Sequence, residues 1–177
     1  MALNFDLLKR LSETPGVAGR EDQVRALVAV ELRTLVDELT VDALGNVIGL
    51  KRGAGQRRVM LAGHMDEIGF MVRHLDDDGF LRLQPIGGFD ARVLNAQRVI
   101  VHSSSGERLR GVLTAAAKPV HLQERQQARA PRLDELFVDV GMAAGRVREL
   151  VEIGDMVTLD RTTERVGDCV VGKALDD

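Results

Sequence analysis

The segment RVMLAGHMDE, residues 58–67, joins an apolar run to a histidine and two acids. Residues 58–62 have the continuous apolar character of a strand buried in a sheet. Gly63 follows and lets the backbone turn without the steric penalty of a Cβ atom. Because functional residues of α/β sheets gather where strands end, this segment predicts an α/β fold with a site at residues 64–67.

His64 and Asp66 are the first candidate functional residues. An imidazole nitrogen is a common ligand of zinc or cobalt. In an extended chain Asp66 lies on the same side as His64, so its carboxylate can accept the other ring N–H and fix the tautomer, as metal-bound histidines usually require. The His-x-Asp pattern is common, however. A hydrogen-bonded histidine beside a surface carboxylate explains these two residues equally well.

Two adjacent acids, Asp176 and Asp177, follow residues 164–175, which have the pattern of a buried strand. One carboxylate could bridge two cations, but considered alone the pair is better explained as a solvated acidic tail. Residues 167–174 nearly match a phosphate-binding loop, yet Ala174 has no hydroxyl to bind magnesium, so we reject nucleotide binding. Cys169 is expected to be a buried apolar side chain.

Composition argues against several classes of protein. The sequence has 24 Lys and Arg against 27 Asp and Glu, a net charge of −3, and no Trp or Tyr, which argues against a nucleic-acid-binding surface. A single cysteine excludes an internal disulfide and a cysteine-based zinc site. The sequence has no apolar run of membrane-helix length and no recognisable secretory signal, so we expect a cytoplasmic protein. His74, His102 and His121 lack acidic partners at ligand spacing and are expected to be structural or surface residues.

The first part of the chain has the patterns of helices followed by a hairpin. Apolar residues at helical spacing predict helices at about residues 5–11 and 21–36. Two short apolar runs, 39–41 and 47–50, flank a turn sequence and predict a β-hairpin.

The middle of the chain reads as a β-rich insert. From 73 to 163 strands alternate with turns, with one short helix at 147–150 and an exposed loop at 123–132. We therefore predict that residues 1–72 and 164–177 belong to one α/β domain. The insert of about 90 residues has a size compatible with a separate small domain.

Motifs along nearly the whole chain resemble, in order, the N-terminal half of the di-metal aminopeptidases that form tetrahedral dodecamers, a family with glutamyl, deblocking and cellulase-M-like members. The matching segments are the opening loop at 12–21, the hairpin at 42–47, the first metal motif at 62–69 and the second metal motif at 170–177. The resemblance implies the front part of a zinc-peptidase-like α/β/α catalytic domain. It also implies that the insert is a small dimerisation domain, a barrel or PDZ-like.

The resemblance also implies a role for each site residue. His64 would ligate one metal ion, and Asp66 would orient His64 as part of the catalytic machinery. Asp176 would bridge two divalent ions, zinc or cobalt, and Asp177 would be its partner across an unusual peptide bond. In such a site the two ions polarise the scissile carbonyl and activate a bridging water. The family's general base, a Glu of a Glu-Glu pair, and its remaining ligands lie downstream of the double Asp.

The expected function is hydrolysis of N-terminal residues from peptides by a metal-dependent aminopeptidase. With only His64 and Asp176 as ligands, these residues alone are expected to bind metal weakly or not at all and to be inactive. We expect a homo-oligomer, a dimer or larger, that forms through exposed strand edges of the insert. The alternative is a non-catalytic oligomerisation module left by gene interruption. The DNA that follows codon 177 would distinguish the two possibilities.

Overall fold

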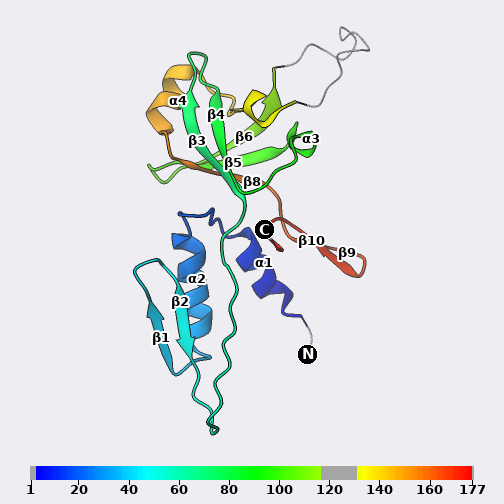
Figure 1. The fold of residues 1–177 in the computed structure, drawn as a ribbon. Coiled ribbons are helices and arrows are strands. Elements are labelled where there is room, and N and C mark those ends of the chain that lie inside the picture. The colour runs from blue at the N-terminus through cyan, green and yellow to red at the C-terminus, as the bar shows by residue number, and fades with distance from the viewer. Residues whose placement is uncertain (1–2, 117–130, 177) are drawn as a thin grey trace. The chain divides into compact units, whose positions relative to one another are not determined.

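The computed structural model describes residues 3–116 and 131–176, which form two compact units (Figure 1). One unit contains the described residues up to Glu67 and from Thr162 onward, and the other contains Ile68–Arg161. The first unit therefore carries the segment 58–67, and the second carries most of the predicted insert. His121, Asp177 and all but the last two residues of the loop predicted at 123–132 lie outside the described residues.

Two helices open the first unit: α1 at Phe5–Glu13 and α2 at Asp22–Arg33. The side-chain oxygen of Asn4 caps α1 by accepting a hydrogen bond from the Leu7 backbone N–H at 3.1 Å. Both predicted helices are present, although α2 ends at Arg33 rather than at residue 36.

The predicted hairpin is also present, formed by the antiparallel strands β1, Glu38–Val41, and β2, Val47–Leu50. Its turn is built by Asp42, whose Oδ1 accepts hydrogen bonds from the backbone N–H groups of Leu44 and Asn46, each at 2.9 Å. The hairpin was predicted, and the structure adds the role of Asp42, because an Asp side chain can substitute for a backbone acceptor.

The buried strand predicted at residues 58–62 is wrong. This segment is extended but belongs to no sheet, and the side chains of Val59, Met60 and Leu61 are 86%, 87% and 92% exposed. An apolar run becomes a buried strand only when neighbouring strands pair with its backbone and other elements cover its side chains. In the part of the chain that the structure describes, no strand pairs with this segment.

The buried-strand pattern at 164–175 also gave a wrong prediction. The segment forms a small hairpin of β9, Glu164–Val166, and β10, Cys169–Val171, most of whose residues are exposed. Cys169, expected to be buried, is exposed. The reason is that, in the described part of the chain, these two strands pair only with one another, so no neighbouring strand shields their apolar side chains.

The second unit is a closed barrel, which confirms the barrel alternative for the insert (Figure 1). Its strands follow the order β3-β4-β7-β6-β5-β8 around the barrel, and every pairing is antiparallel. The strands are β3 Gly69–Leu75, β4 Leu81–Ile86, β5 Arg98–His102, β6 Arg108–Ala115, β7 Leu136–Asp139 and β8 Met156–Leu159. The short elements α3 (Ala91–Leu94), η2 (Leu133–Glu135) and α4 (Ala144–Leu150) connect them.

Alternating side chains fill the interior of the barrel. Val99, Val101, Leu113, Val138 and Val157 are completely buried there. This alternation is typical of a sheet with one face turned inward. The barrel thus has its own apolar core, which is the requirement for an independently folding unit.

Closure of the barrel corrects one expectation about association. The expectation was that free strand edges of the insert pair across a two-fold axis. In the described residues the six strands pair in a closed ring, and a closed barrel has no free edge to offer. Among the described residues, the groups that such a unit offers to a second copy are therefore the side chains on its outer surface.

The two described histidines of the barrel are structural or surface residues, as expected. His102 Nε2 lies 2.9 Å from Thr158 Oγ1, across the pairing of β5 and β8. His74 lies exposed on β3. Among the described helices, none has the length and apolarity needed to cross a membrane.

Candidate functional site

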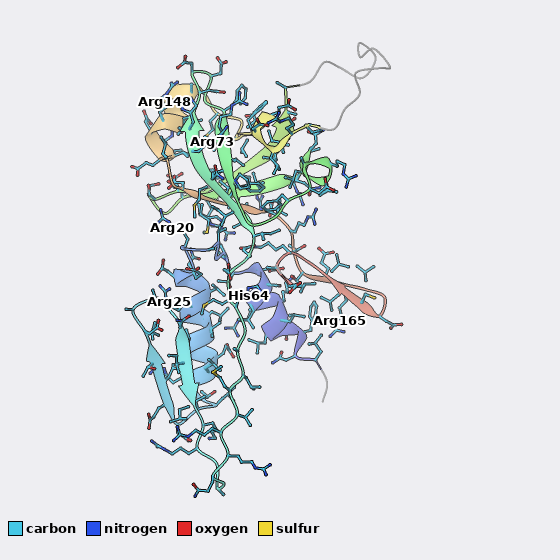
Figure 2. The ribbon with its side chains drawn as sticks, in the orientation of Figure 1. Arg20, Arg25, His64, Arg73, Arg148 and Arg165 are labelled. Atoms are coloured by element: carbon cyan, nitrogen blue, oxygen red, sulfur yellow. The ribbon has the colours of Figure 1, made fainter. Side chains whose placement is uncertain are left out.

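His64 lies on the extended segment that connects β2 and β3 in the chain (Figure 2), and Asp66 follows two residues later. His64 Nδ1 is 3.0 Å from Asp66 Oδ1, and the two side chains are 51% and 38% exposed. A carboxylate beside Nδ1 favours the tautomer that carries its proton there and its lone pair on Nε2. A contact of this kind is the one that orients the ring of a metal-bound histidine.

Asp176, the other predicted ligand, lies exposed near the end of the described chain. Two residues before it, Ala174 has a backbone φ of +51°, a left-handed conformation that turns the chain sharply. Asp177 lies outside the described residues. Within residues 3–116 and 131–176, no three His, Cys, Asp or Glu side chains lie close enough to hold a metal ion.

A buried ion pair joins the two predicted site segments, and sequence reasoning missed it. Lys173 Nζ lies 2.6 Å and 2.7 Å from the two carboxylate oxygens of Glu67. The side chains of Lys173 and Glu67 are 7% and 5% exposed. Glu67 comes three residues after His64, and Lys173 comes three residues before Asp176. The sequence held a signal at Lys173 only, which stands between the apolar residues 169–171 and 174–175, whereas Glu67 directly follows the charged Asp66.

A third segment meets the ion pair at the loop before α2. Glu67 Oε1 accepts a hydrogen bond from the Gly16 N–H at 3.3 Å, and the Glu67 N–H donates to the Gly16 carbonyl at 2.9 Å. Val17, which is completely buried, forms a parallel β-bridge with Glu67. Burial raises the pKa of Glu67, while the charge and hydrogen bond of Lys173 and the Gly16 N–H oppose that rise.

The returning chain is fixed to α1 through Thr163, which is completely buried. Its Oγ1 lies 2.6 Å from Ser12 Oγ, its carbonyl accepts from Lys9 Nζ at 2.9 Å, and its N–H donates to Glu13 Oε1 at 2.6 Å. Desolvation alone would raise the pKa of Glu13, but the hydrogen bond from the Thr163 N–H, the hydrogen bond and charge of Lys9, and the charge of Lys173 lower it overall. The network holds the start of the segment that leads to Lys173.

The close approach of the chain to Thr163 requires a glycine at position 172. A Cβ atom on Gly172 would lie 2.4 Å from Thr163 Oγ1, closer than a carbon and an oxygen can approach. The chain therefore passes directly against Thr163 before it reaches Lys173. The local sequence folds as it does because a residue with no side chain precedes the buried lysine.

The candidate ligands have the chemistry that zinc or cobalt requires, but there are too few of them. The imidazole of His64 and the carboxylates of Asp66 and Asp176 are the groups that such ions take. Zinc sites use three or four protein ligands, and the described residues bring no three of them together. The described residues alone therefore do not complete a metal site.

Comparison with known proteins identifies the family of the chain. A family model described as M42 glutamyl aminopeptidase matches residues 45–177. FrvX of Escherichia coli is 38% identical over 177 residues, which cover 98% of this chain and 49% of FrvX.

Two solved structures resemble the chain over nearly its whole length. Aminopeptidase APDkam598 of the archaeon Desulfurococcus kamchatkensis has a TM-score of 0.88 and 39% identity, covering 98% of this chain and 48% of that one. The TET1 peptidase of Pyrococcus horikoshii, which can assemble into a tetrahedron or a large octahedral shell, has a TM-score of 0.84 and 30% identity, covering 97% and 51%. The chain thus spans about half the length of the relatives it matches. It belongs to the M42 glutamyl aminopeptidase family.

Proposed function

We propose that the chain supplies the N-terminal part of a metal-dependent aminopeptidase that removes N-terminal residues from peptides. His64 is the metal ligand, Asp66 orients it, Asp176 is the bridging ligand and Asp177 is the partner of Asp176. The observation that carries the proposal is the His64–Asp66 contact of 3.0 Å in a member of the M42 family. The cytoplasmic location predicted from the sequence stays a prediction.

The residues of this chain would prepare the site rather than complete it. Asp66 holds the proton of His64 on Nδ1 and fixes the plane of the ring, so that the Nε2 lone pair has a set direction. M42 aminopeptidases use divalent metal ions, and bound zinc or cobalt would activate water for attack on a peptide carbonyl. The residue that would take the proton from that water is expected in the half of the relatives that this chain does not match.

Zinc binding tests the proposal. Titration calorimetry should show binding weaker than about 1 µM, or ~8 kcal/mol, because complete structural zinc sites reach ~10–16 kcal/mol with all their ligands. His64→Ala should abolish the remaining binding. His74→Ala, which removes an exposed histidine of the barrel, is the matched control and should bind zinc like the unaltered chain. Tight binding that survives His64→Ala would place the metal site elsewhere and contradict the proposal.

We also propose that the barrel unit makes the chain a dimer or a larger homo-oligomer. The TET1 relative assembles into closed shells. The barrel exposes the apolar side chains of Val93, Val112, Met142 and Ile153, which could lie in a contact between copies. Because isologous pairs are the commonest symmetric contact of soluble proteins, a two-fold contact is the simplest arrangement.

A non-catalytic oligomerisation module is the second candidate function. The observation that favours it is the barrel itself, which is closed and has its own core. This function requires self-association but no metal. Retained association without zinc binding is what the module predicts, whereas zinc binding that His64→Ala abolishes would favour the metal-dependent enzyme.

A further inference from the structure

The ion pair between Glu67 and Lys173 links segments that are 106 residues apart in the chain. Lys173 Nζ contacts both oxygens of the Glu67 carboxylate, and a backbone N–H from Gly16 reaches one of them. Three segments of the first unit therefore meet at one carboxylate. In the described residues this is the one ion pair in which both side chains are less than a tenth exposed.

Stability alone is a poor explanation for such a pair. Taking two charges out of water costs nearly as much as their attraction returns, so apolar residues of similar size often stabilise a fold as well or better. A buried pair differs from apolar packing in being directional. Its geometry is satisfied in one arrangement only, which makes it suited to fixing the register of two segments.

The register fixed here is that of the predicted site. His64 and Asp176 are each three residues from a member of the pair, a span of at most about 10 Å of extended chain. The backbone on either side is constrained as well: Val17 bridges to Glu67, and Gly172 packs against Thr163. A shift of Lys173 by one residue along the chain would carry Asp176 with it.

We infer that the Glu67–Lys173 pair positions the segment carrying Asp176 against the segment carrying His64 and Asp66. That these segments carry metal-site residues rests on the proposed function. That the two segments are held against each other rests on the ion pair. Neither residue of the pair is a metal ligand in this account. They act through the two segments that they join.

Hydrogen exchange in the full chain tests the inference directly. Lys173→Met removes the charge and keeps an unbranched apolar stem. It should raise amide exchange at residues 63–67 and 172–176 by more than about ten-fold, since a broken contact lets its segments open locally. Exchange in α1, α2 and the barrel should stay unchanged. Lys51→Met, which removes an exposed lysine paired with Asp37, is the matched control and should leave both segments unchanged.

Restoring the charge should restore the protection. Lys173→Arg and the swapped double variant Glu67→Lys/Lys173→Glu each keep one positive and one negative partner, and at least one of them should return exchange to within a few-fold of the unaltered chain. If neither restores it, the lysine acts by packing and the inference is wrong. A rise that spreads through α1 and α2 would show that the pair only stabilises the unit as a whole, and would also overturn it.

Cobalt absorption in the same samples separates this inference from the proposed function. If the unaltered chain shows the visible bands of bound Co²⁺ and Lys173→Met loses them while Lys173→Arg or the swap regains them, both stand. If the unaltered chain binds no cobalt, the proposed metal site fails, but the exchange data still decide the role of the pair. If Lys173→Met keeps the same cobalt spectrum and the same exchange, the pair positions nothing and the inference is overturned.

Discussion

Added zinc or cobalt should leave the chain far below ~1 s⁻¹ on aminoacyl p-nitroanilides, the low end of ordinary enzyme turnover. The reason lies in the functional groups that these residues supply. His64 and Asp66 prepare one ligand, and Asp176 offers a second. We assign no residue of the described chain as the base that takes a proton from water, and loss of positioned acid–base catalysis alone costs ~10²–10⁴-fold.

The measurement needs protein free of peptidases from the expression host. His64→Ala, purified in parallel, reports any contaminating activity, because a contaminant is unaffected by that change. We expect the unaltered chain and His64→Ala to show the same low background. Turnover near ~1 s⁻¹ that disappears in His64→Ala would show that these residues form a complete site, and would contradict the account.

The second prediction concerns oligomeric state. The isolated barrel, residues 68–161, should sediment as a dimer or larger at micromolar concentration. These boundaries keep β3 whole, which a piece beginning at residue 73 would not, because β3 begins at Gly69. Independent folding is expected because the barrel closes on itself and buries its own core. A folded monomer would move the contact to the other unit and defeat the assignment.

Sedimentation of the full chain needs a control, because the exposed segment 58–62 is a second source of association there. Val59 and Leu61 are almost fully exposed, and apolar patches of this kind promote contacts that are not specific. The double variant Val59→Asp/Leu61→Asp removes that tendency without touching the barrel. The full chain with this change should still sediment as a dimer or larger.

Local patterns in the sequence predicted the elements whose stability is local. The helices α1 and α2 follow from apolar spacing, and the β1–β2 turn follows from Asp42 and a glycine at position 45 with a φ of +88°. The acidic turn at residues 76–79, between β3 and β4, is stabilised in the same local way. There Asp76 Oδ1 accepts a hydrogen bond from the Phe80 N–H at 2.8 Å. Such elements depend on neighbours within a few residues, which a single sequence displays.

The wrong predictions concern residues whose environment is set by distant segments. Residues 58–62 and 169–171 have the composition of buried strands, but burial depends on elements that cover them. The composition of a segment shows that it could form a buried strand. It does not show whether another strand or helix covers that segment in the fold. The same reason explains the free strand edges expected of the insert, because closure of a barrel depends on the pairing of β3 with β8, far apart in sequence.

The site was predicted in part for the same physical reason. His64 and Asp66 are two residues apart, so their contact follows from the geometry of an extended chain. Glu67 and Lys173 are 106 residues apart, and nothing in their local sequences pairs them. A buried charge needs a partner, but only the fold shows that these two residues are buried and that each is the partner of the other.

The location of a bound ion tests the central claim most directly. Mn²⁺ added to the ¹⁵N-labelled chain broadens the amide signals of nearby residues. We expect broadening centred on residues 63–67 and 174–176, with the acidic turn at 76–78 unaffected, and we expect His64→Ala to remove it. Broadening centred on the turn at 76–78 or elsewhere in the barrel, or unchanged by His64→Ala, would show that His64 and Asp176 do not share a metal site.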